Sequence, residues 1–217
     1  MANNYSYLLK YIIIGDSSVG KTNLLMKFTH NKFTDEYRAT IGVEFDAKNL
    51  KIDEKIFRIQ LWDTAGQENF RSITRAYYKN CVCALIIYDI TKKQTFENIQ
   101  YWLDDVRNES PKSALIILIG NKIDLGSERK VSYEEGSEFA KKNGIIFMET
   151  SARTGEGVDE MFIKSVKEIE QRIKDNFYDL TSETCGIKKG NAAINEENSN
   201  GIGLNDGGSK NKNKSCC

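Results

Sequence analysis

The chain contains one proline, one histidine and no excess of charge, because 31 basic residues balance 31 acidic ones. Without a global basic field, we expect no nucleic-acid partner. No apolar run reaches the roughly 18–20 residues that a membrane-spanning helix needs, and the N-terminus lacks signal-peptide architecture. The five cysteines fit reduced thiols in the cytosol rather than a secreted disulfide scaffold. Two of them, Cys216 and Cys217, are the last residues of the chain.

Short apolar runs alternate with helix-period stretches through most of the chain. The runs of strand type are residues 7–14, 45–52, 56–62, 82–88, 115–120 and 145–148, and the helical stretches are 20–30, 70–80, 94–108, 133–142 and 158–175. This order predicts an α/β three-layer sandwich with a mostly parallel six-stranded sheet and helices on both faces. The short gap between residues 45–52 and 56–62 predicts a hairpin and therefore one antiparallel edge strand.

The composition changes near the C-terminus. The stretch after Leu180 is rich in Gly, Asn, Ser and Lys and nearly lacks aromatic residues. Such a segment buries too little apolar surface to offset its ordering entropy. We therefore assign residues 1–177 to the folded domain and residues 178–217 to a flexible tail.

Residues 15–22, with the sequence GDSSVGKT, fit the phosphate-binding pattern GxxxxGK[ST]. They lie between a predicted strand and a predicted helix, which is the context that the P-loop requires. Backbone N–H groups of the loop and the helix N-terminus favour a bound phosphate. Lys21 can reach the terminal phosphates, and the Thr22 hydroxyl can ligate Mg²⁺.

Two later loops indicate that the base is guanine. Asn121 and Asp124 follow the strand that ends at residue 120, and the Asp124 carboxylate can accept both N–H groups on one edge of guanine. A site built on such hydrogen bonds can reject the wrong ligand by roughly 10⁴–10⁵-fold. Asn121 would tie the loops together, the Lys122 stem would pack on the base, and the segment Ser151, Ala152 and Arg153 can offer a backbone N–H to the guanine carbonyl.

A third group of residues suggests a switch that depends on the terminal phosphate. Asp63 can hold Mg²⁺ through water, the Gly66 N–H can approach the γ-phosphate, and Gln67 is then next to the attacking water. The Thr40 hydroxyl could complete the Mg²⁺ shell only while the γ-phosphate is present. Loops held in this way relax on hydrolysis. Taken alone, Thr40 reads equally well as an ordinary loop threonine.

These motifs, together with ETSA at residues 149–152, occur in the order and spacing of the Ras-superfamily small GTPases, which the chain resembles. Within that superfamily it resembles the Rab family. The segments that carry the resemblance are IGVEF at 41–45, the run 57–62, RSITRAYY at 71–78, YDIT at 88–91 and the terminal Cys-Cys.

The resemblance implies a set of site residues. GTP or GDP would be bound by Ser17, Ser18, Val19, Gly20, Lys21, Thr22, Asn23, Phe33, Tyr37, Thr40, Gly66, Asn121, Lys122, Asp124, Ser151, Ala152 and Arg153. Thr22, Thr40 and Asp63 would serve Mg²⁺, and Gln67 would be catalytic. Ile41, Phe45, Trp62 and Tyr77 would be read by effectors, although aromatic residues at such positions are also commonly part of a core.

The resemblance also implies a lipid-anchored monomer. Cys216 and Cys217 would be geranylgeranylated by the Rab prenyltransferase with its escort protein, and two lipids give stable anchoring. The other expected partners are a guanine nucleotide exchange factor, a Rab GTPase-activating protein, a GDP-dissociation inhibitor and membrane-trafficking effectors. The segments resemble most the Rabs that act between the endoplasmic reticulum and the Golgi, which places the chain on those membranes with a cytosolic pool. Rabs of recycling-endosome or trans-Golgi traffic are the alternative.

Two other functional classes stay open on the residues alone. A P-loop kinase of small metabolites would bind ATP, and the base-reading loop argues against it. A non-hydrolysing GTP-binding adaptor is disfavoured because Asp63, Gly66 and Gln67 are all in place.

Overall fold

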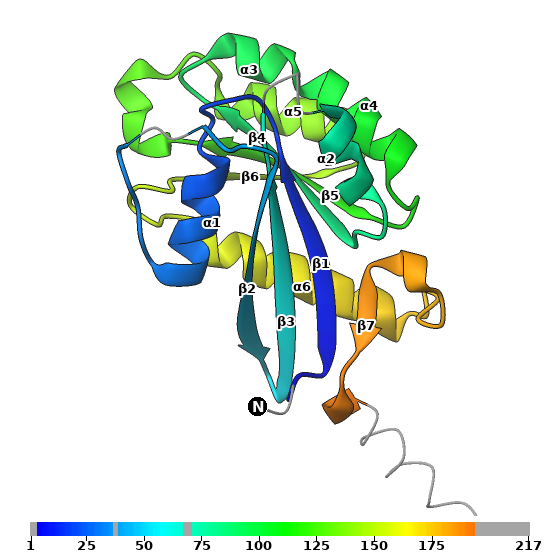
Figure 1. The fold of residues 1–217 in the computed structure, drawn as a ribbon. Coiled ribbons are helices and arrows are strands. Elements are labelled where there is room, and N and C mark those ends of the chain that lie inside the picture. The colour runs from blue at the N-terminus through cyan, green and yellow to red at the C-terminus, as the bar shows by residue number, and fades with distance from the viewer. Residues whose placement is uncertain (1–3, 37–38, 67–70, 194–217) are drawn as a thin grey trace, which may run out of the picture.

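The fold was analysed in a computed structural model, which describes residues 4–36, 39–66 and 71–193 (Figure 1). Its elements follow the predicted alternation of strands and helices. In chain order they are β1 (Tyr7–Ile14), α1 (Lys21–His30), β2 (Val43–Ile52), β3 (Lys55–Thr64), α2 (Arg71–Tyr78), β4 (Cys83–Asp89), α3 (Lys93–Glu97), α4 (Ile99–Glu109), β5 (Leu115–Asn121), the 3₁₀ helix η2 (Ile123–Glu128), α5 (Tyr133–Asn143), β6 (Ile146–Thr150), α6 (Val158–Lys174), the 3₁₀ helix η3 (Glu183–Cys185) and β7 (Ile187–Lys189).

The main path of the sheet has the order β2-β3-β1-β4-β5-β6. The pairs β1–β3, β1–β4, β4–β5 and β5–β6 are parallel, whereas β2–β3 is antiparallel. The hairpin turns at Asp53, whose φ of 51° lies in the left-handed region that Asp tolerates better than most residues. The predicted mixed sheet with one antiparallel edge strand is therefore confirmed.

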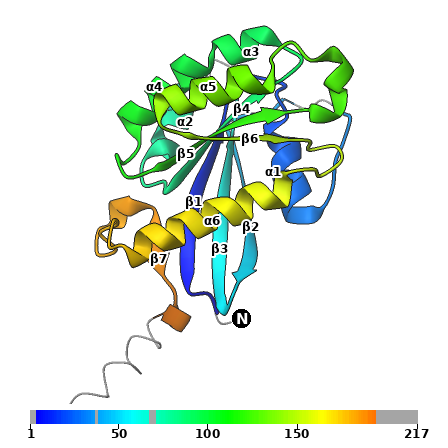
Figure 2. The ribbon, with the colours of Figure 1, turned by 180° about the vertical axis from the view of Figure 1, so that it is seen from behind.

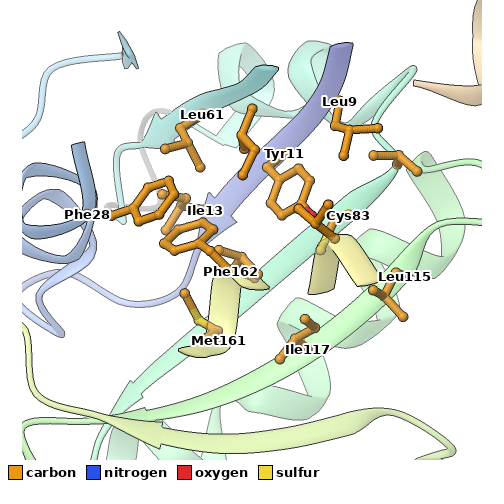
Figure 3. Packing of buried hydrophobic residues seen from close by; sticks show 14 of the residues in the cluster. Leu9, Tyr11, Ile13, Phe28, Leu61, Cys83, Leu115, Ile117, Met161 and Phe162 are labelled. Atoms are coloured by element: carbon orange, nitrogen blue, oxygen red, sulfur yellow. The ribbon is translucent and has the colours of Figure 1, made fainter. Parts of the chain in front are cut away.

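Helices cover both faces of the sheet, as Figures 1 and 2 show from opposite sides. All seven residues of β4 are buried, and their side chains alternate between two cores because successive residues of a strand point to opposite faces. Cys83, Leu85 and Ile87 pack with α1 and α6 in one core (Figure 3). Ala84, Ile86 and Tyr88 pack in the other, with α4 and parts of α2 and α5. The predicted three-layer sandwich is confirmed.

The structure corrects the expected start of the flexible tail. Residues 178–193 pack on the domain, and Tyr178 and Ile187 are buried. Strand β4 pairs with β1 only from Tyr11 onward, so the first half of β1 has a free edge, and β7 pairs with Tyr7–Leu9 there in antiparallel fashion. The segment is polar on average, so its composition predicted a flexible tail, but its few apolar residues lie at positions that face the core. Residues 194–217 lie outside the described part of the chain.

None of the helices in the described residues is long and apolar enough to cross a membrane.

Candidate functional site

A cavity of about 750 Å³ lies where the loops that follow the parallel strands meet. Ligands of open α/β sheets bind at this edge, outside the carboxyl ends of the strands. Of the residues predicted to bind nucleotide, those that line it are Ser17, Ser18, Gly20, Lys21, Thr22, Asn23, Phe33, Thr40, Gly66, Asn121, Lys122, Asp124, Ala152 and Arg153. Three other predicted site residues are fully buried beneath the cavity wall, namely Val19, Asp63 and Ser151. The described part of the chain does not include Tyr37 and Gln67.

The phosphate loop is compact because its glycines allow close backbone approaches. Gly15 has φ of 136°, and a Cβ there would lie 2.2 Å from the carbonyl oxygen of Ile87. Gly20, with φ of 97°, is the N-cap of α1. The Lys21 ammonium folds over the loop and donates to the carbonyl oxygens of Gly15 at 2.9 Å and Asp16 at 2.7 Å. A bound phosphate would offer this ammonium a charged acceptor in place of two carbonyls.

Burial lowers the pKa of Lys21 to about 8, although the nearby carboxylates of Asp63 and Asp16 oppose that shift. An anion in the loop would favour the charged form of the ammonium further. The lysine is therefore held ready for an anionic ligand, in a position where its charge is only partly compensated.

Asp16 anchors the phosphate loop to the helices behind it, a role that the sequence did not reveal. Its carboxylate accepts hydrogen bonds from the Trp102 indole at 2.8 Å and from the Asn98 side chain at 2.7 Å. Asn98 also separates α3 from α4, so the single helix expected over residues 94–108 is two helices. The partners are 86 and 82 residues from Asp16 in the chain, and no local pattern connects them.

The side chains of Thr22, Thr40 and Asp63 meet at the end of the cavity next to the phosphate loop. Thr22 Oγ1 donates to Asp63 Oδ2 at 2.5 Å and lies 3.0 Å from Thr40 Oγ1. Asp63 Oδ1 is buried and has no hydrogen-bond partner among the described residues. An unsatisfied carboxylate oxygen beside two hydroxyls fits Mg²⁺, which prefers oxygen ligands.

The surroundings of Asp63 would favour a cation beside its carboxylate. Burial raises the pKa of Asp63 to about 6, and Lys21 offsets only part of that effect. The carboxylate of Glu44, which lines the cavity, raises the pKa of Asp63 further. Sequence reasoning missed Glu44, which stands on an edge strand directly opposite Asp63 in the β2–β3 register.

Asn121 joins three loops of the site. Its side-chain amide donates to the carbonyl oxygen of Val19 at 2.8 Å. Its carbonyl oxygen accepts from the Thr150 hydroxyl and from the backbone N–H of Ala152, both at 3.2 Å. The phosphate loop, the loop after β5 and the loop after β6 are thereby held in one arrangement.

The side chains around the predicted base position are fixed in a similar way. Asp124 Oδ1 accepts from the Ser151 hydroxyl at 2.6 Å, which orients the carboxylate. The Lys122 ammonium pairs with the buried Asp89 carboxylate at 2.6 Å. This ion pair sets the direction of the Lys122 stem along the cavity wall.

The segment after α1 closes the cavity on its other side. Asn23 exchanges two hydrogen bonds with the backbone of Thr34, at 2.9 and 3.2 Å. The Arg153 guanidinium lies 5.4 Å from the centre of the Phe33 ring and pairs with Asp35. Thr34 and Asp35 were not predicted, because polar residues in a loop carry no distinctive sequence signal.

The segments that precede β2 and follow β3 contact each other and the phosphate loop. The backbone N–H of Ala65 donates to the carbonyl oxygen of Gly42 at 2.9 Å. A Cβ on Gly66 would lie 2.5 Å from the backbone of Asp16 and Ser17. A rearrangement at either segment therefore affects the other.

The residues predicted to bind effectors form an exposed surface beside these segments. Ile41 is 81% exposed and Phe45 is 51% exposed. The ring of Trp62 lies 4.8 Å from that of Phe45 and 5.1 Å from that of Tyr77, and both Trp62 and Tyr77 are only partly buried. The arrangement differs from an ordinary core, because one of the three rings is exposed and the other two are only partly buried.

The sequence matches the family model described as the Ras family over residues 10–171. The matched span runs from β1 to the last turn of α6 and includes every described residue that lines the cavity. Members of this family bind GTP and GDP with Mg²⁺, hydrolyse GTP, and interact with exchange factors and activating proteins. The chain therefore belongs to the Ras family of small GTPases and is a GTP/GDP switch.

Proposed function

We propose that this GTPase is of the Rab type and regulates vesicle-mediated transport between the endoplasmic reticulum and the Golgi. The observation that carries the proposal is the exposed aromatic surface of Phe45, Trp62 and Tyr77, which adjoins the two segments that would respond to the γ-phosphate. The Rab-like segments and the terminal Cys-Cys support the same conclusion. A Rab of recycling-endosome or trans-Golgi traffic is the alternative route.

In this proposal the nucleotide lies along the cavity. The phosphates occupy the loop of residues 15–22, where Lys21 and the backbone N–H groups bind them. The base lies against Asp124, which the Ser151 hydroxyl orients. Phe33 and Tyr37 would enclose the nucleotide from the side opposite the sheet.

Thr22 and Thr40 would ligate Mg²⁺, with Asp63 held to it through water. The ion would neutralise charge on the phosphates. Because Thr40 Oγ1 lies 3.0 Å from Thr22 Oγ1, the position of Thr40 would depend on what is bound at the phosphate end of the cavity. The loss of the γ-phosphate would release Thr40 and with it the adjacent Ile41, and the Ala65–Gly42 hydrogen bond would extend the change to the segment after β3.

Gln67 would position the water that attacks the γ-phosphate. Arg153 is the only arginine among the described residues that line the cavity, and it is engaged with Asp35 at the base end. The described chain thus brings no arginine to the phosphate end, and hydrolysis should be slow until an activating protein supplies one.

The C-terminus would attach the switch to the membrane through geranylgeranyl groups on Cys216 and Cys217. An escort protein with the prenyltransferase would add them, and a GDP-dissociation inhibitor would extract the GDP form. The GTP form would stay on the cytoplasmic face of the membrane and recruit effectors.

Hydrolysis is tested with Gln67→Leu in a single-turnover assay with and without a Rab-activating protein. We expect the variant to keep its nucleotide affinity and to lose most of the activated rate. The matched control is Gln94→Leu, which changes an exposed glutamine on α3. Activated turnover at the wild-type rate in Gln67→Leu would refute the role of Gln67, and no hydrolysis in the wild type would favour a non-hydrolysing adaptor.

The route is tested by imaging the tagged chain in its own cells beside a chain that lacks Cys216 and Cys217. We expect the full chain on endoplasmic reticulum and Golgi membranes and the shortened chain throughout the cytosol. Recycling endosomes or the trans-Golgi network as the compartment would support the alternative route. The same distribution for both chains would contradict lipid anchoring.

A further inference from the structure

A second cavity, of about 420 Å³, lies at the end of the sheet opposite the nucleotide site. It forms where β5 and β6 begin, between the C-terminal ends of α4 and α5. Arg172, in the last turn of α6, completes its wall. Because β5 and β6 run parallel to β1, this cavity is on the same side as the start of β1.

The wall of this cavity contains three cationic side chains, those of Arg107, Lys112 and Arg172, and no carboxylate. Arg107 donates to the carbonyl oxygen of Asn143 at 2.8 Å, and Lys112 donates to that of Arg107 at 2.6 Å. Neither has an ion-pair partner within the ranges that the structure describes. Arg172 is paired with Glu168 at 2.8 Å. Two cations are therefore fixed at the cavity by neutral acceptors and keep their charge available for an anion.

An exposed aromatic residue stands beside these cations. Phe177 is 55% exposed, and its backbone N–H donates to the carbonyl oxygen of Arg172 at 2.9 Å. The Arg172 guanidinium lies 5.4 Å from the centre of the Phe177 ring. Aromatic side chains next to cations are the combination that lies at membrane–water interfaces.

The C-terminal segment leaves the domain at the same end of the sheet. Strand β7 finishes at Lys189, opposite Tyr7, and the backbone N–H of Gly190 donates to the carbonyl oxygen of Ser6 at 2.8 Å. In Figure 1 this segment and the end of α6 lie at the lower right, away from the loop between β1 and α1. The chain then continues through residues 194–217 to the two terminal cysteines.

We propose that this end of the domain faces the bilayer, with the phosphate of an anionic phospholipid headgroup in the cavity of Arg107, Lys112 and Arg172 and with Phe177 in the interface. The inference rests on the proposed function in one respect, because the lipidated C-terminus would bring this surface to the membrane. In this orientation the nucleotide cavity and the exposed aromatic surface face away from the bilayer and stay open to partners.

The test uses the full chain without prenyl groups and measures its co-sedimentation with vesicles at low ionic strength. One set of vesicles is phosphatidylcholine alone, and the others also contain phosphatidylserine or a phosphoinositide. We expect a preference for the anionic vesicles that disappears at high salt. The double variant Arg107→Gln/Lys112→Gln should lower binding to anionic vesicles roughly 25-fold, which is about fivefold for each cation.

Two matched controls separate this site from a general effect of charge or apolar surface. Lys130→Gln/Lys164→Gln removes the same charge from exposed positions outside the cavity and should keep most of the binding. Phe177→Ala should weaken binding more than Tyr133→Ala, which changes a residue that is 54% exposed on α5. If the double variant is unstable, Lys112→Gln alone replaces an exposed side chain and should lower binding about fivefold.

Equal binding to neutral and anionic vesicles would overturn the proposal, and so would an equal loss in the cavity variant and its charge-matched control. Because the assay uses unprenylated protein, its result does not depend on whether Cys216 and Cys217 are lipidated. Failure of the membrane-facing surface is thus distinguished from failure of the proposed Rab function, which the imaging experiment tests.

Discussion

Ile187→Ala tests whether residues 178–193 belong to the folded domain. Ile187 is 3% exposed and packs in the same core as Leu9 and Tyr178. Truncation of a buried Ile to Ala costs about 2–4 kcal/mol, because the apolar contact is lost and a cavity is left. For a domain of this size that corresponds to a fall in the melting temperature of roughly 5–15 °C.

The matched control is Lys188→Ala, on the same strand but with an exposed side chain. We expect its free energy of unfolding to change by less than about 0.5 kcal/mol. Urea unfolding of both full-length variants, with GDP at a fixed concentration, measures the difference. The reasoning is refuted if Ile187→Ala loses no more stability than Lys188→Ala, since that would place the segment off the domain in solution.

Three further predictions concern the nucleotide site and the thiols. Asp124→Ala should lower the ratio of GTP affinity to ATP affinity at least about a hundredfold, because a carboxylate that accepts two N–H groups is lost. Competition of GTP and of ATP with labelled GDP measures this ratio. An unchanged ratio would show that the base lies elsewhere. Trp102→Phe removes the 2.8 Å hydrogen bond to Asp16. It should speed GDP release roughly tenfold or more, since a hydrogen bond to a charged group contributes about 1.5–3 kcal/mol. Stopped-flow measurement of GDP release compares it with the neighbouring control Tyr101→Phe, and equal release rates in the two variants would contradict the anchoring role of Trp102. Burial raises the pKa of the Cys81 thiol to about 11, so about one Cys81 thiol in a thousand is ionised at pH 8. Iodoacetamide, followed by peptide mapping, should therefore label Cys81 only after unfolding. Rapid labelling of the native chain would show instead that this thiol is accessible.

Local patterns were sufficient for much of the fold and of the site. Strand β1 was predicted with its observed bounds, Tyr7–Ile14, because a short, mostly apolar run that ends in three isoleucines lies between a polar start and a glycine and is typical of a buried strand. The phosphate loop was found because its chemistry depends on consecutive residues between one strand and one helix. Asn121 and Asp124 were predicted as base-site residues for a similar reason, since they lie at the end of a buried strand and just after it, and both line the cavity.

Contacts between distant parts of the chain were not predictable in this way. Strand β7 has three residues, too short for an alternation of apolar and polar residues to be recognised. The position of β7 depends on the first residues of β1, whose edge β4 leaves unpaired. This free edge exists only after the sheet has formed. The cations at the second cavity come from two helices, α4 and α6, and from the loop after α4, which meet only in the tertiary structure.

The sequence by itself determined the order of the elements and the phosphate loop, and it predicted the residues that would read the base, because each depends on neighbours a few positions away. Only the tertiary structure decided that Asp16 is held by Trp102 and Asn98, that Asp63 keeps one carboxylate oxygen unsatisfied, and that the polar segment after α6 joins the sheet. Those features come from burial and from hydrogen bonds between residues as distant in the chain as Asp16 and Trp102 or Ser6 and Gly190, and the energy of such contacts has no counterpart in a local pattern.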